Sequence, residues 1–280
     1  MKRKILIPTD FSKNAENAIK YAIELYKNEE CDFYLLNVFF VIGFATDNIM
    51  VPEIGEIAYK TERKTSENEL KTALKLLEKN NTSKHHFFTI SKFNSLLNSI
   101  DEVVEEKNID IIIMGTQGAT NASNIIFGSN TVTIMEKERS CPVLAIPSVA
   151  SYSKPKEIVF PTSYNTPYKK RELKHLIDIA TINKAAIRIL HIEKDKEQEQ
   201  SERINRLLLD EYFDGIEHSF HILYNVEVET ALDCFVQSRE SDMIAFVNKK
   251  HGFLEAIFSR HLAKELGYKS KVPVLTMHSL

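Results

Sequence analysis

The 280-residue chain has no tryptophan, only eight glycines and eight prolines, and three cysteines. Cys31, Cys141 and Cys234 are odd in number, lie far apart and form no C-x-x-C pair. The sequence therefore predicts neither a disulfide framework nor a zinc knuckle. We expect all three cysteines to be small, buried apolar residues.

An excess of positive charge is also missing. The formal net charge is -3 and the isoelectric point is about 6.3, so no overall positive field is present to hold a nucleic-acid backbone by counterion release. Long apolar runs are missing too, because the run after the basic N-terminus ends at Pro8 and Asp10, too soon for a signal sequence or a membrane span. We expect a cytoplasmic protein with neither nucleic acid nor membrane as a partner.

The chain does contain an internal repeat. Four pairs of similar segments occur in the same order: residues 4–10 and 157–163, 110–114 and 242–246, 126–127 and 257–258, and 141–148 and 272–279. The spacing within a pair falls from 153 to 131 residues, so the second copy is 22 residues shorter. We predict two domains, residues 1–148 and 155–280, with the polar stretch 148–156 as the linker.

Each copy alternates short apolar runs with amphipathic helical patterns. The run 111–113 is apolar throughout, as expected when helices cover both faces of a parallel sheet. The fold class predicted is α/β, with two tandem doubly wound domains that each contain a five-stranded, mostly parallel sheet. In the first copy we expect strands at 4–8, 33–39, 85–90, 109–114 and 143–146, and helices after the N-cap Ser12 and at 66–79, 95–106 and 130–137. In the second copy we expect strands at 157–161, 186–192, 217–223, 243–247 and 274–277, and helices at 168–183, 197–211, 227–239 and 254–266.

Three glycines come after the fourth expected strand, in the spacing G-x2-G-x9-G-S from Gly115 through Gly118 to Gly128. Glycine lets backbone N–H groups approach phosphate oxygens with no Cβ in the way. Gly128 opens a helix whose free N–H groups and dipole favour phosphate, and the hydroxyls of Ser129 and Thr131 can donate further hydrogen bonds. The pattern predicts a phosphate-binding loop, with glycines that serve only the turns as the alternative.

The first expected strand ends at Pro8, Thr9 and Asp10, which border the same crevice at the topological switch point. Asp10 is placed there to accept hydrogen bonds from a ribose or a base. The alternative is a capping or turn residue, because Asp-Phe-Ser precedes a helix. Neither a Walker A sequence nor G-x-G-x-x-G occurs, which argues against a P-loop NTPase and a dinucleotide dehydrogenase.

The histidines and acidic residues give no pattern of a metal or catalytic site. The pairs at 85–86 and at 218 and 221 fall on opposite sides of their expected strands, so neither pair converges on a metal ion. The charged run 193–202 is interpreted as an exposed helix. No catalytic triad or pair of carboxylates can be recognised from spacing, so we predict no catalytic and no metal-binding residue.

Taken together, ILIPTDFS at 5–12, LLNV at 35–38, IIIMGTQG at 111–118, FGS at 127–129 and CPVLAIP at 141–147 resemble the universal stress protein family, its tandem members and its ATP-binding branch. The resemblance implies an adenine nucleotide alpha hydrolase-like fold, with ATP bound in the first domain, with or without Mg²⁺. It implies contacts to the adenosine from Asp10 and the backbone of Val38, beside Pro8 and Thr9. Around the phosphates it implies Met114, Gly115, Gly118, Gly128, Ser129, Asn130 and Thr131. Gln117 departs from the family pattern, where many members carry His or Arg, and this removes one phosphate contact.

The second copy departs from the phosphate-loop pattern. Gly115 corresponds there to Val247 or Asn248, and Gly128 corresponds to Ser259. A Cβ now stands where backbone should meet phosphate, so we predict a degenerate, structural copy. The alternative is an anion site at the basic cluster 249–251, near a helix start.

The resemblance also implies that the last strand of each copy, near 141–147 and 272–276, pairs across a two-fold axis. We expect this pairing within the chain, as an intramolecular pseudo-dimer, and leave open a homodimer of chains. The main functional hypothesis is a stress-response regulator: ATP in the first domain orders the loop 118–128 and changes a surface that an unidentified protein partner reads. The alternatives are a slow ATPase or phosphotransfer enzyme, with Gln117 to orient water, and a nucleotide-free dimeric scaffold.

Overall fold

The computed structural model describes residues 2–41, 52–80, 84–116, 128–165, 167–193, 200–248 and 272–279. The first half of the chain contains β1 (Arg3–Pro8), α1 (Lys13–Leu25), β2 (Cys31–Phe39), α2 (Pro52–Asn80), β3 (His86–Phe93), α3 (Leu96–Lys107), β4 (Ile111–Gly115), α4 (Ser129–Lys137) and β5 (Val143–Ile146). The second half contains β6 (Glu157–Thr162), the short 3-10 helix η1 (Lys170–Leu173), α5 (Lys174–Asn183), β7 (Ala186–Glu193), α6 (Gln200–Tyr212), β8 (His218–Tyr224), α7 (Val228–Arg239), β9 (Met243–Asn248) and β10 (Val274–His278).

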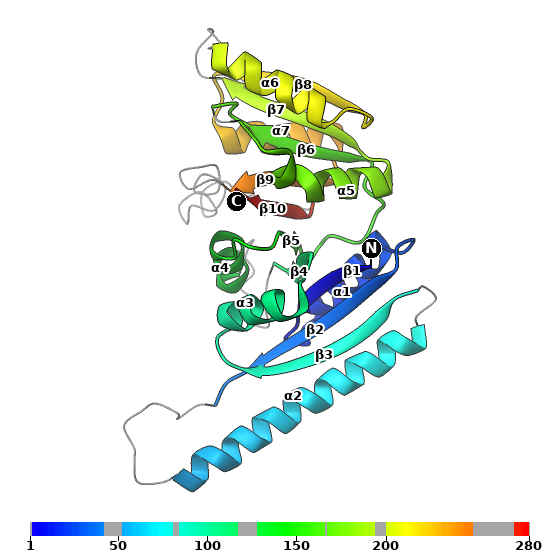
Figure 1. The fold of residues 1–280 in the computed structure, drawn as a ribbon, viewed down its shortest axis with the longest axis vertical. Coiled ribbons are helices and arrows are strands. Elements are labelled where there is room, and N and C mark those ends of the chain that lie inside the picture. The colour runs from blue at the N-terminus through cyan, green and yellow to red at the C-terminus, as the bar shows by residue number, and fades with distance from the viewer. Residues whose placement is uncertain are drawn as a thin grey trace.

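All ten strands belong to one sheet, in the order β3-β2-β1-β4-β5-β10-β9-β6-β7-β8. Neighbouring strands are parallel within each half, and among the described strands only the central pair, β5 and β10, is antiparallel. Leu144 of β5 lies opposite Leu275 of β10 at this junction (Figure 1). Each half is therefore a doubly wound unit, and the pseudo-dimer within one chain is confirmed.

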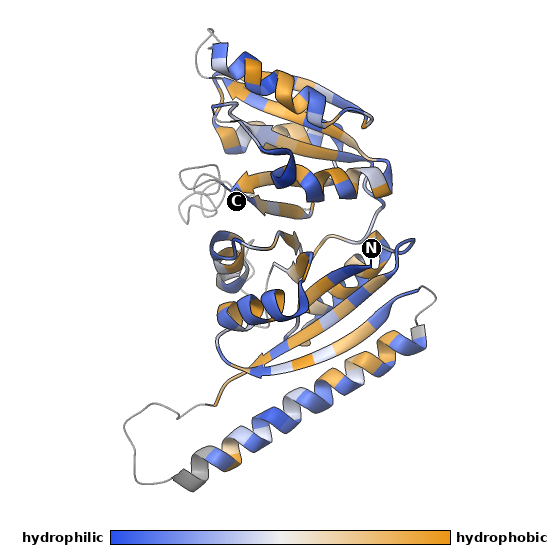
Figure 2. Cartoon of the chain, in the orientation of Figure 1, coloured by the Kyte–Doolittle hydropathy of each residue, from blue (hydrophilic) through white to orange (hydrophobic). Residues whose placement is uncertain are grey.

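Two apolar clusters cover the opposite faces of the sheet. Successive residues of β1 alternate between them, with Ile5 and Ile7 in one cluster and Leu6 in the other. Residues of α1, α5 and α6 pack on the first face, and residues of α3, α4 and α7 on the second. This burial on both faces explains the continuous apolar runs of the strands. In Figure 2 the strands are mainly orange, whereas hydrophilic residues lie along the helices.

The internal repeat extends to single hydrogen bonds after the first strand of each half. Phe11 and Tyr164 both adopt left-handed backbone angles, with φ of 61° and 57°. The N–H of Phe11 donates to Oγ1 of Thr9 at 3.0 Å, and that of Tyr164 donates to Oγ1 of Thr162 at 3.2 Å. Non-glycine residues rarely adopt this conformation, so the same costly turn has been kept in both halves.

Helix α2 is longer than the sequence pattern predicted. It begins at Pro52 rather than at residue 66, so the predicted start of this helix was wrong. Proline is well tolerated at the first position of a helix, where its missing N–H has no partner in any case. Exposed pairs such as Lys60 with Glu56, at 2.6 Å, support the added turns.

The three cysteines differ in environment. Cys31 and Cys141 are buried as expected, but Cys234 is exposed, so its predicted burial was wrong. The reason is its position on α7, whose buried face is formed by Ala231, Leu232, Phe235 and Val236. The predicted helix 254–266 and the basic cluster 249–251 lie outside the described residues. In the part of the chain that is described, none of the helices combines the length and the apolar character that crossing a membrane requires.

Candidate functional site

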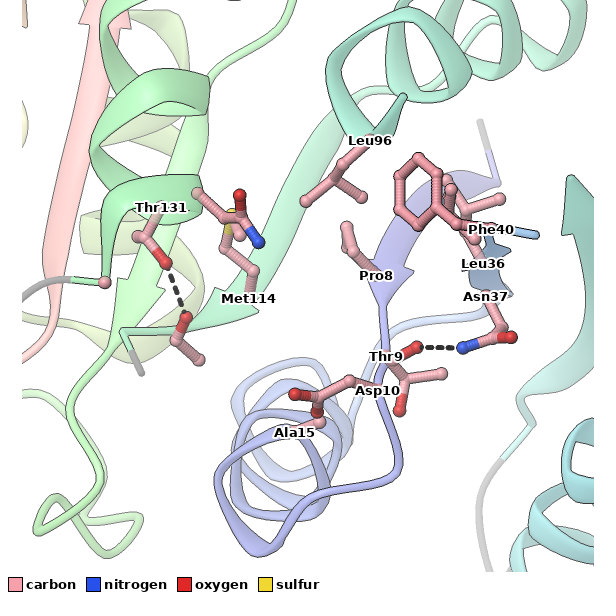
Figure 3. Close-up of a pocket in the computed structure, with 14 residues that line it drawn as sticks. Pro8, Thr9, Asp10, Ala15, Leu36, Asn37, Phe40, Leu96, Met114 and Thr131 are labelled. Carbon is pink, nitrogen blue, oxygen red and sulfur yellow. Dashed lines mark hydrogen bonds between the residues drawn. The ribbon is translucent and has the colours of Figure 1, made fainter. Parts of the chain in front are cut away.

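A cavity of about 220 Å³ opens at the carboxyl ends of β1, β2 and β4. The chain runs from β1 outward to β2 and β3 and then returns to β4 on the other side of β1, so the cavity lies at the topological switch point. Figure 3 shows Met114 and Thr131 on one side of Pro8, and Leu36 and Asn37 on the other. The cavity thus draws on strands and helices that are far apart in the sequence.

Most of the residues expected around a nucleotide line this cavity. They are Pro8, Thr9, Asp10, Val38, Met114, Gly115, Gly128, Asn130 and Thr131. Gly118 lies outside the described residues, as does Gln117, on which the slow-ATPase alternative depends. Ser129 is the first residue of α4, but the position of its side chain is not described.

The sequence analysis missed five lining residues: Ala15, Leu36, Asn37, Phe40 and Leu96. Asn37 is buried, and its Nδ2 donates to the carbonyl oxygen of Thr9 at 2.7 Å, which ties the end of β1 to β2. A polar residue inside the apolar run of β2 was the available signal. Phe40 and Leu96 carry no such signal, because an apolar residue just beyond a strand or at a helix start is ordinary.

Asp10 takes part in the turn between β1 and α1. Its Oδ1 accepts a hydrogen bond from the N–H of Ser12 at 3.1 Å. Ser12 is the N-cap of α1, as predicted, because its hydroxyl accepts from the N–H of Ala15 at 3.3 Å. Asp10 therefore does act as a turn residue, as the alternative interpretation proposed. Since the side chain is exposed and lines the cavity, this turn does not remove it from the candidate site.

The N-terminus of α4 faces the cavity with a glycine as its cap. Gly128 has φ of -60° and ψ of 151°, and no side chain caps the helix. Its own N–H donates to the carbonyl oxygen of Thr116. The first N–H groups of a helix have no partner within the helix, and the positive end of the helix dipole lies there too. This end of the cavity is suited to an anion.

Thr131 does not play the part expected of its hydroxyl. The Oγ1 atom donates to the carbonyl oxygen of Gly115 at 2.9 Å, and the residue is 2 % exposed. A hydroxyl has a single proton, so this hydrogen bond uses the proton that was predicted to reach a phosphate. The hydroxyl instead joins the end of β4 to the first turn of α4.

Gly115 is required by packing. A Cβ built on this residue would lie 3.0 Å from the carbonyl oxygen of Asn14, in the first turn of α1. Real Cβ atoms are rarely so close to a backbone oxygen, so a side chain here would push α1 away from β4. The alternative in which glycine serves local structure thus has direct support at Gly115.

The histidines that were weighed as metal ligands lie elsewhere and have separate neighbours. His85 is buried against the ring of Phe33, and burial lowers its pKa, whereas the neighbouring His86 lies 3.6 Å from Asp32. His218 lies 3.0 Å from Asp210, and His221 lies 2.8 Å from the hydroxyl of Ser219, with its pKa lowered by burial.

The exposed helix predicted for the run 193–202 is wrong for its first residue. Glu193 ends strand β7 and is 7 % exposed. Residues 194–199 lie outside the described part of the chain, and α6 begins at Gln200. The many charges of the run suggested solvent exposure, but its first glutamate continues the alternation of β7 and points to the covered face.

The family model and the curated relatives point to one family. The family model described as Universal stress protein family matches residues 1–147. Universal stress protein MJ0577 of Methanocaldococcus jannaschii is 33% identical over 157 residues, which cover 52% of this chain and 95% of that protein. Universal stress protein MJ0531 of the same organism is 31% identical over 146 residues, which cover 51% and 81%. The crystal structure of a universal stress protein from Archaeoglobus fulgidus has a TM-score of 0.68 and 17% identity, over 98% of this chain and 95% of the other, which shows a shared fold.

Proposed function

The chain belongs to the universal stress protein family, and from this we propose that it is a cytoplasmic stress-response regulator that binds ATP in the cavity of its first half. The bound nucleotide, with or without Mg²⁺, alters a surface that a protein partner reads. The nucleotide-binding domain comprises residues 1–148, and residues 155–280 form a degenerate domain that completes the sheet.

The single observation that carries this proposal is that one cavity combines an apolar wall with a helix N-terminus suited to an anion. Leu36, Phe40 and Leu96 offer an apolar wall on which a flat base can pack. Gly128 and Asn130, at the other end, offer the N-terminus of α4, which suits phosphate oxygens.

Two residues expected at the ribose line the same cavity. They are Asp10, which offers its carboxylate, and Val38 of β2, which adjoins the apolar wall. A hydroxyl-bearing sugar there can donate to the carboxylate and to backbone oxygens. An apolar base, a polar sugar and an anionic chain in this order are the features of a nucleotide.

The rival interpretation is a nucleotide-free scaffold, and one observation favours it. Gly115 is explained by its contact with Asn14 alone. Gly128 separates the two interpretations, because its φ and ψ are those of ordinary extended backbone, which any L-amino acid adopts. Close packing explains why residue 115 is a glycine. The backbone angles of Gly128 give no such reason for a glycine at residue 128.

The test compares Gly128→Asp with Gly128→Asn in the full-length chain. Both residues are good N-caps and nearly equal in volume, so α4 should be retained or stabilised in both variants. Only aspartate places a negative charge where the phosphates would bind. We expect isothermal titration calorimetry to show ATP affinity at least about 10-fold lower for the Asp than for the Asn variant, a difference of about 1.4 kcal/mol.

Equal ATP affinities in the two variants, or no ATP binding and no co-purified nucleotide in the unmodified chain, would contradict the proposal. AMP provides a further comparison, because it lacks the outer phosphates and should distinguish the two variants less. Steady phosphate release by the unmodified chain that is lost in Gly128→Asp would instead favour the slow-ATPase alternative.

A further inference from the structure

A buried histidine in the second half has one ring nitrogen without a partner. His191 is 3 % exposed, and its Nδ1 lies 2.9 Å from the carbonyl oxygen of Thr162. A carbonyl oxygen only accepts, so Nδ1 carries a proton, and in the neutral imidazole Nε2 then presents a lone pair. Nε2 is buried and has no hydrogen-bond partner among the described residues. A buried nitrogen left in this state calls for a ligand.

Two carboxylates converge on this histidine. Glu193 is two residues further along β7, on the same face of the strand, and Glu202 comes from the first turn of α6. One ligand atom from each of the three residues lies within 4.8 Å of the other two. Zinc holds nitrogen and oxygen donors at about 2.0–2.2 Å, so small rotations of the two glutamate side chains would bring the three donors around one ion.

Among the described residues, neither Glu193 nor Glu202 has a cation within ion-pair distance, and Arg206, one turn after Glu202, lies over the ring of Phe220 at 4.7 Å. The arginines on the same sheet are engaged elsewhere, since Arg188 pairs with Glu157 and Glu217, and Arg239 pairs with Glu157. Glu193 is only 7 % exposed, so its carboxylate lies beside His191 and Glu202 with little contact with water.

The cluster is held by its surroundings. The ring of Tyr164 lies 4.7 Å from the ring of His191, centroid to centroid. Tyr164 in turn accepts a hydrogen bond at its carbonyl oxygen from Nδ2 of Asn205, one turn after Glu202 on α6, at 2.6 Å. Leu209 anchors the same helix in the apolar cluster that contains β7 residues. These contacts fix both the ring and the helix that carry the donors.

We propose that His191, Glu193 and Glu202 bind one divalent transition-metal ion of the Zn²⁺ type. The hydrogen bond from Nδ1 to a backbone carbonyl is the outer contact that orients a metal-bound imidazole. One imidazole with two carboxylates suits zinc better than magnesium, which prefers oxygen alone. With three protein ligands, at least one position remains for water or a small ligand.

The first half shows what the same place looks like without a metal ligand. Asn37 occupies the position of His191, because β1 pairs with β2 in the register that β6 keeps with β7. It makes the equivalent hydrogen bond to Thr9, but an amide has no second ring nitrogen. Phe39 stands at the position of Glu193 and packs on Tyr59 of α2. The equivalent positions thus hold an aromatic contact in the first half and the proposed metal donors in the second half.

The equivalent asparagine of the first half suggests the substitution that tests the proposal. His191→Asn retains a donor for the Thr162 carbonyl and removes the ligand nitrogen. Glu202→Gln removes one carboxylate from a partly exposed position, where folding is least at risk. His86→Asn is the matched control, because that histidine also lies beside a carboxylate, that of Asp32, but its side chain is 53 % exposed.

The experiment titrates Zn²⁺ into the full-length chain by calorimetry after removal of metal with a chelator, in the absence of nucleotide. We expect one equivalent of zinc to bind, with affinity lowered at least about 10-fold in His191→Asn and Glu202→Gln and unchanged in His86→Asn. Mg²⁺ in about 100-fold excess should not displace the zinc.

Zinc affinity in the unmodified chain no higher than in His191→Asn would overturn the proposal, and so would an equal loss in His86→Asn or displacement by Mg²⁺. Full retention of affinity in Glu202→Gln would overturn the three-ligand assignment. None of the three residues lines the cavity of the first half. A failure of ATP binding would therefore leave this measurement intact.

Discussion

The two halves share a turn after their first strand but differ in how the chain continues from that turn into the next helix. In the first half α1 begins at Lys13, five residues after β1 ends at Pro8. In the second half the chain continues from Thr162 to Lys170 before a short 3-10 helix leads into α5. The first helix of the first half is thereby brought close against the end of β4.

This difference changes how the glycines should be interpreted. The second half keeps the sheet although Val247 and Asn248, both buried, stand near the position of Gly115. That comparison suggests that the fold does not require glycine there. However, the early start of α1 places Asn14 against Gly115, so the first half does require it. A repeat is a good control only where its local packing is the same.

Among the substitutions that test this comparison, Gly115→Val should have the largest effect on stability and on ATP binding. The added side chain would meet the backbone of Asn14, so we expect a loss of about 3 kcal/mol in the free energy of unfolding, as overpacking produces. ATP affinity should fall below detection, because β4 and α1 both border the cavity. Urea unfolding and calorimetry measure the two effects.

Gly215→Ala is the matched control for this substitution. Gly215 has φ of +81° with open space around its position, so alanine there costs only backbone strain, about 1 kcal/mol, and leaves ATP binding unchanged. If Gly115→Val were no more destabilising than Gly215→Ala, the contact with Asn14 would not explain the glycine.

A smaller effect is expected at the opposite end of the first strands. Lys4 and Glu157 occupy equivalent positions, since each donates its N–H to an aspartate, Asp110 at 2.8 Å and Asp242 at 3.0 Å. Of the two, Glu157 alone lies in a charge network, which is partly exposed and includes Arg188 and Arg239. Burial alone would raise its pKa, but hydrogen bonds from Arg239, Arg188 and Ser241 lower it to about 2.

Because the folded-state pKa of Glu157 is depressed, its stabilising effect is present above its unfolded value, about 4.5, and is lost as pH falls toward about 2. Glu157→Gln should lower the free energy of unfolding by about 2 kcal/mol at pH 7, after allowance for solvent screening. The difference from the unmodified chain should shrink between pH 5 and pH 2.

Lys4→Met serves as the control for this pH dependence. Its ammonium donates to the carbonyl oxygen of Lys107, a group that does not titrate. The difference in stability between Lys4→Met and the unmodified chain should therefore stay constant over the same range. A constant difference for Glu157→Gln as well would mean that the arginine network does not depress the pKa of Glu157.

The sequence predicted the fold well because its signals are local. Apolar runs and amphipathic periods mark strands and helices, and the repeat of residues 4–10 at 157–163 marks the two halves. The lining residues Pro8, Thr9 and Asp10 and the glycines follow from a strand end and from glycine spacing. Val38, Met114 and Asn130 were expected only from the family resemblance. The bond from Thr131 to Gly115 and the contact of Gly115 with Asn14 depend on how α1 and α4 approach β4, which no local pattern encodes.

The cluster in the second half shows the same limit. His191 and Glu193 alternate on one strand, so the sequence could have suggested a shared face. Glu202 is brought to them only by the packing of α6. A strand pair alone is a weak signal, and the third donor depends on tertiary structure.

The smallest change in stability is expected from Asp10→Ser, which gives the first half the residue of the second. In the second half Ser163 accepts the turn hydrogen bond from the N–H of Asn165 at 3.4 Å, where Asp10 accepts from Ser12 at 3.1 Å. Serine should therefore keep the turn, and stability should change by no more than about 0.5 kcal/mol.

ATP affinity should respond more strongly than stability to Asp10→Ser. A carboxylate hydrogen-bonded to a ribose hydroxyl contributes about 1.5 kcal/mol or more, so we expect a loss of about 10-fold. The reverse change, Ser163→Asp, should leave ATP binding unaltered. Unchanged affinity in Asp10→Ser would assign Asp10 to the turn alone, and the two halves would then differ at this position only in the strength of one hydrogen bond.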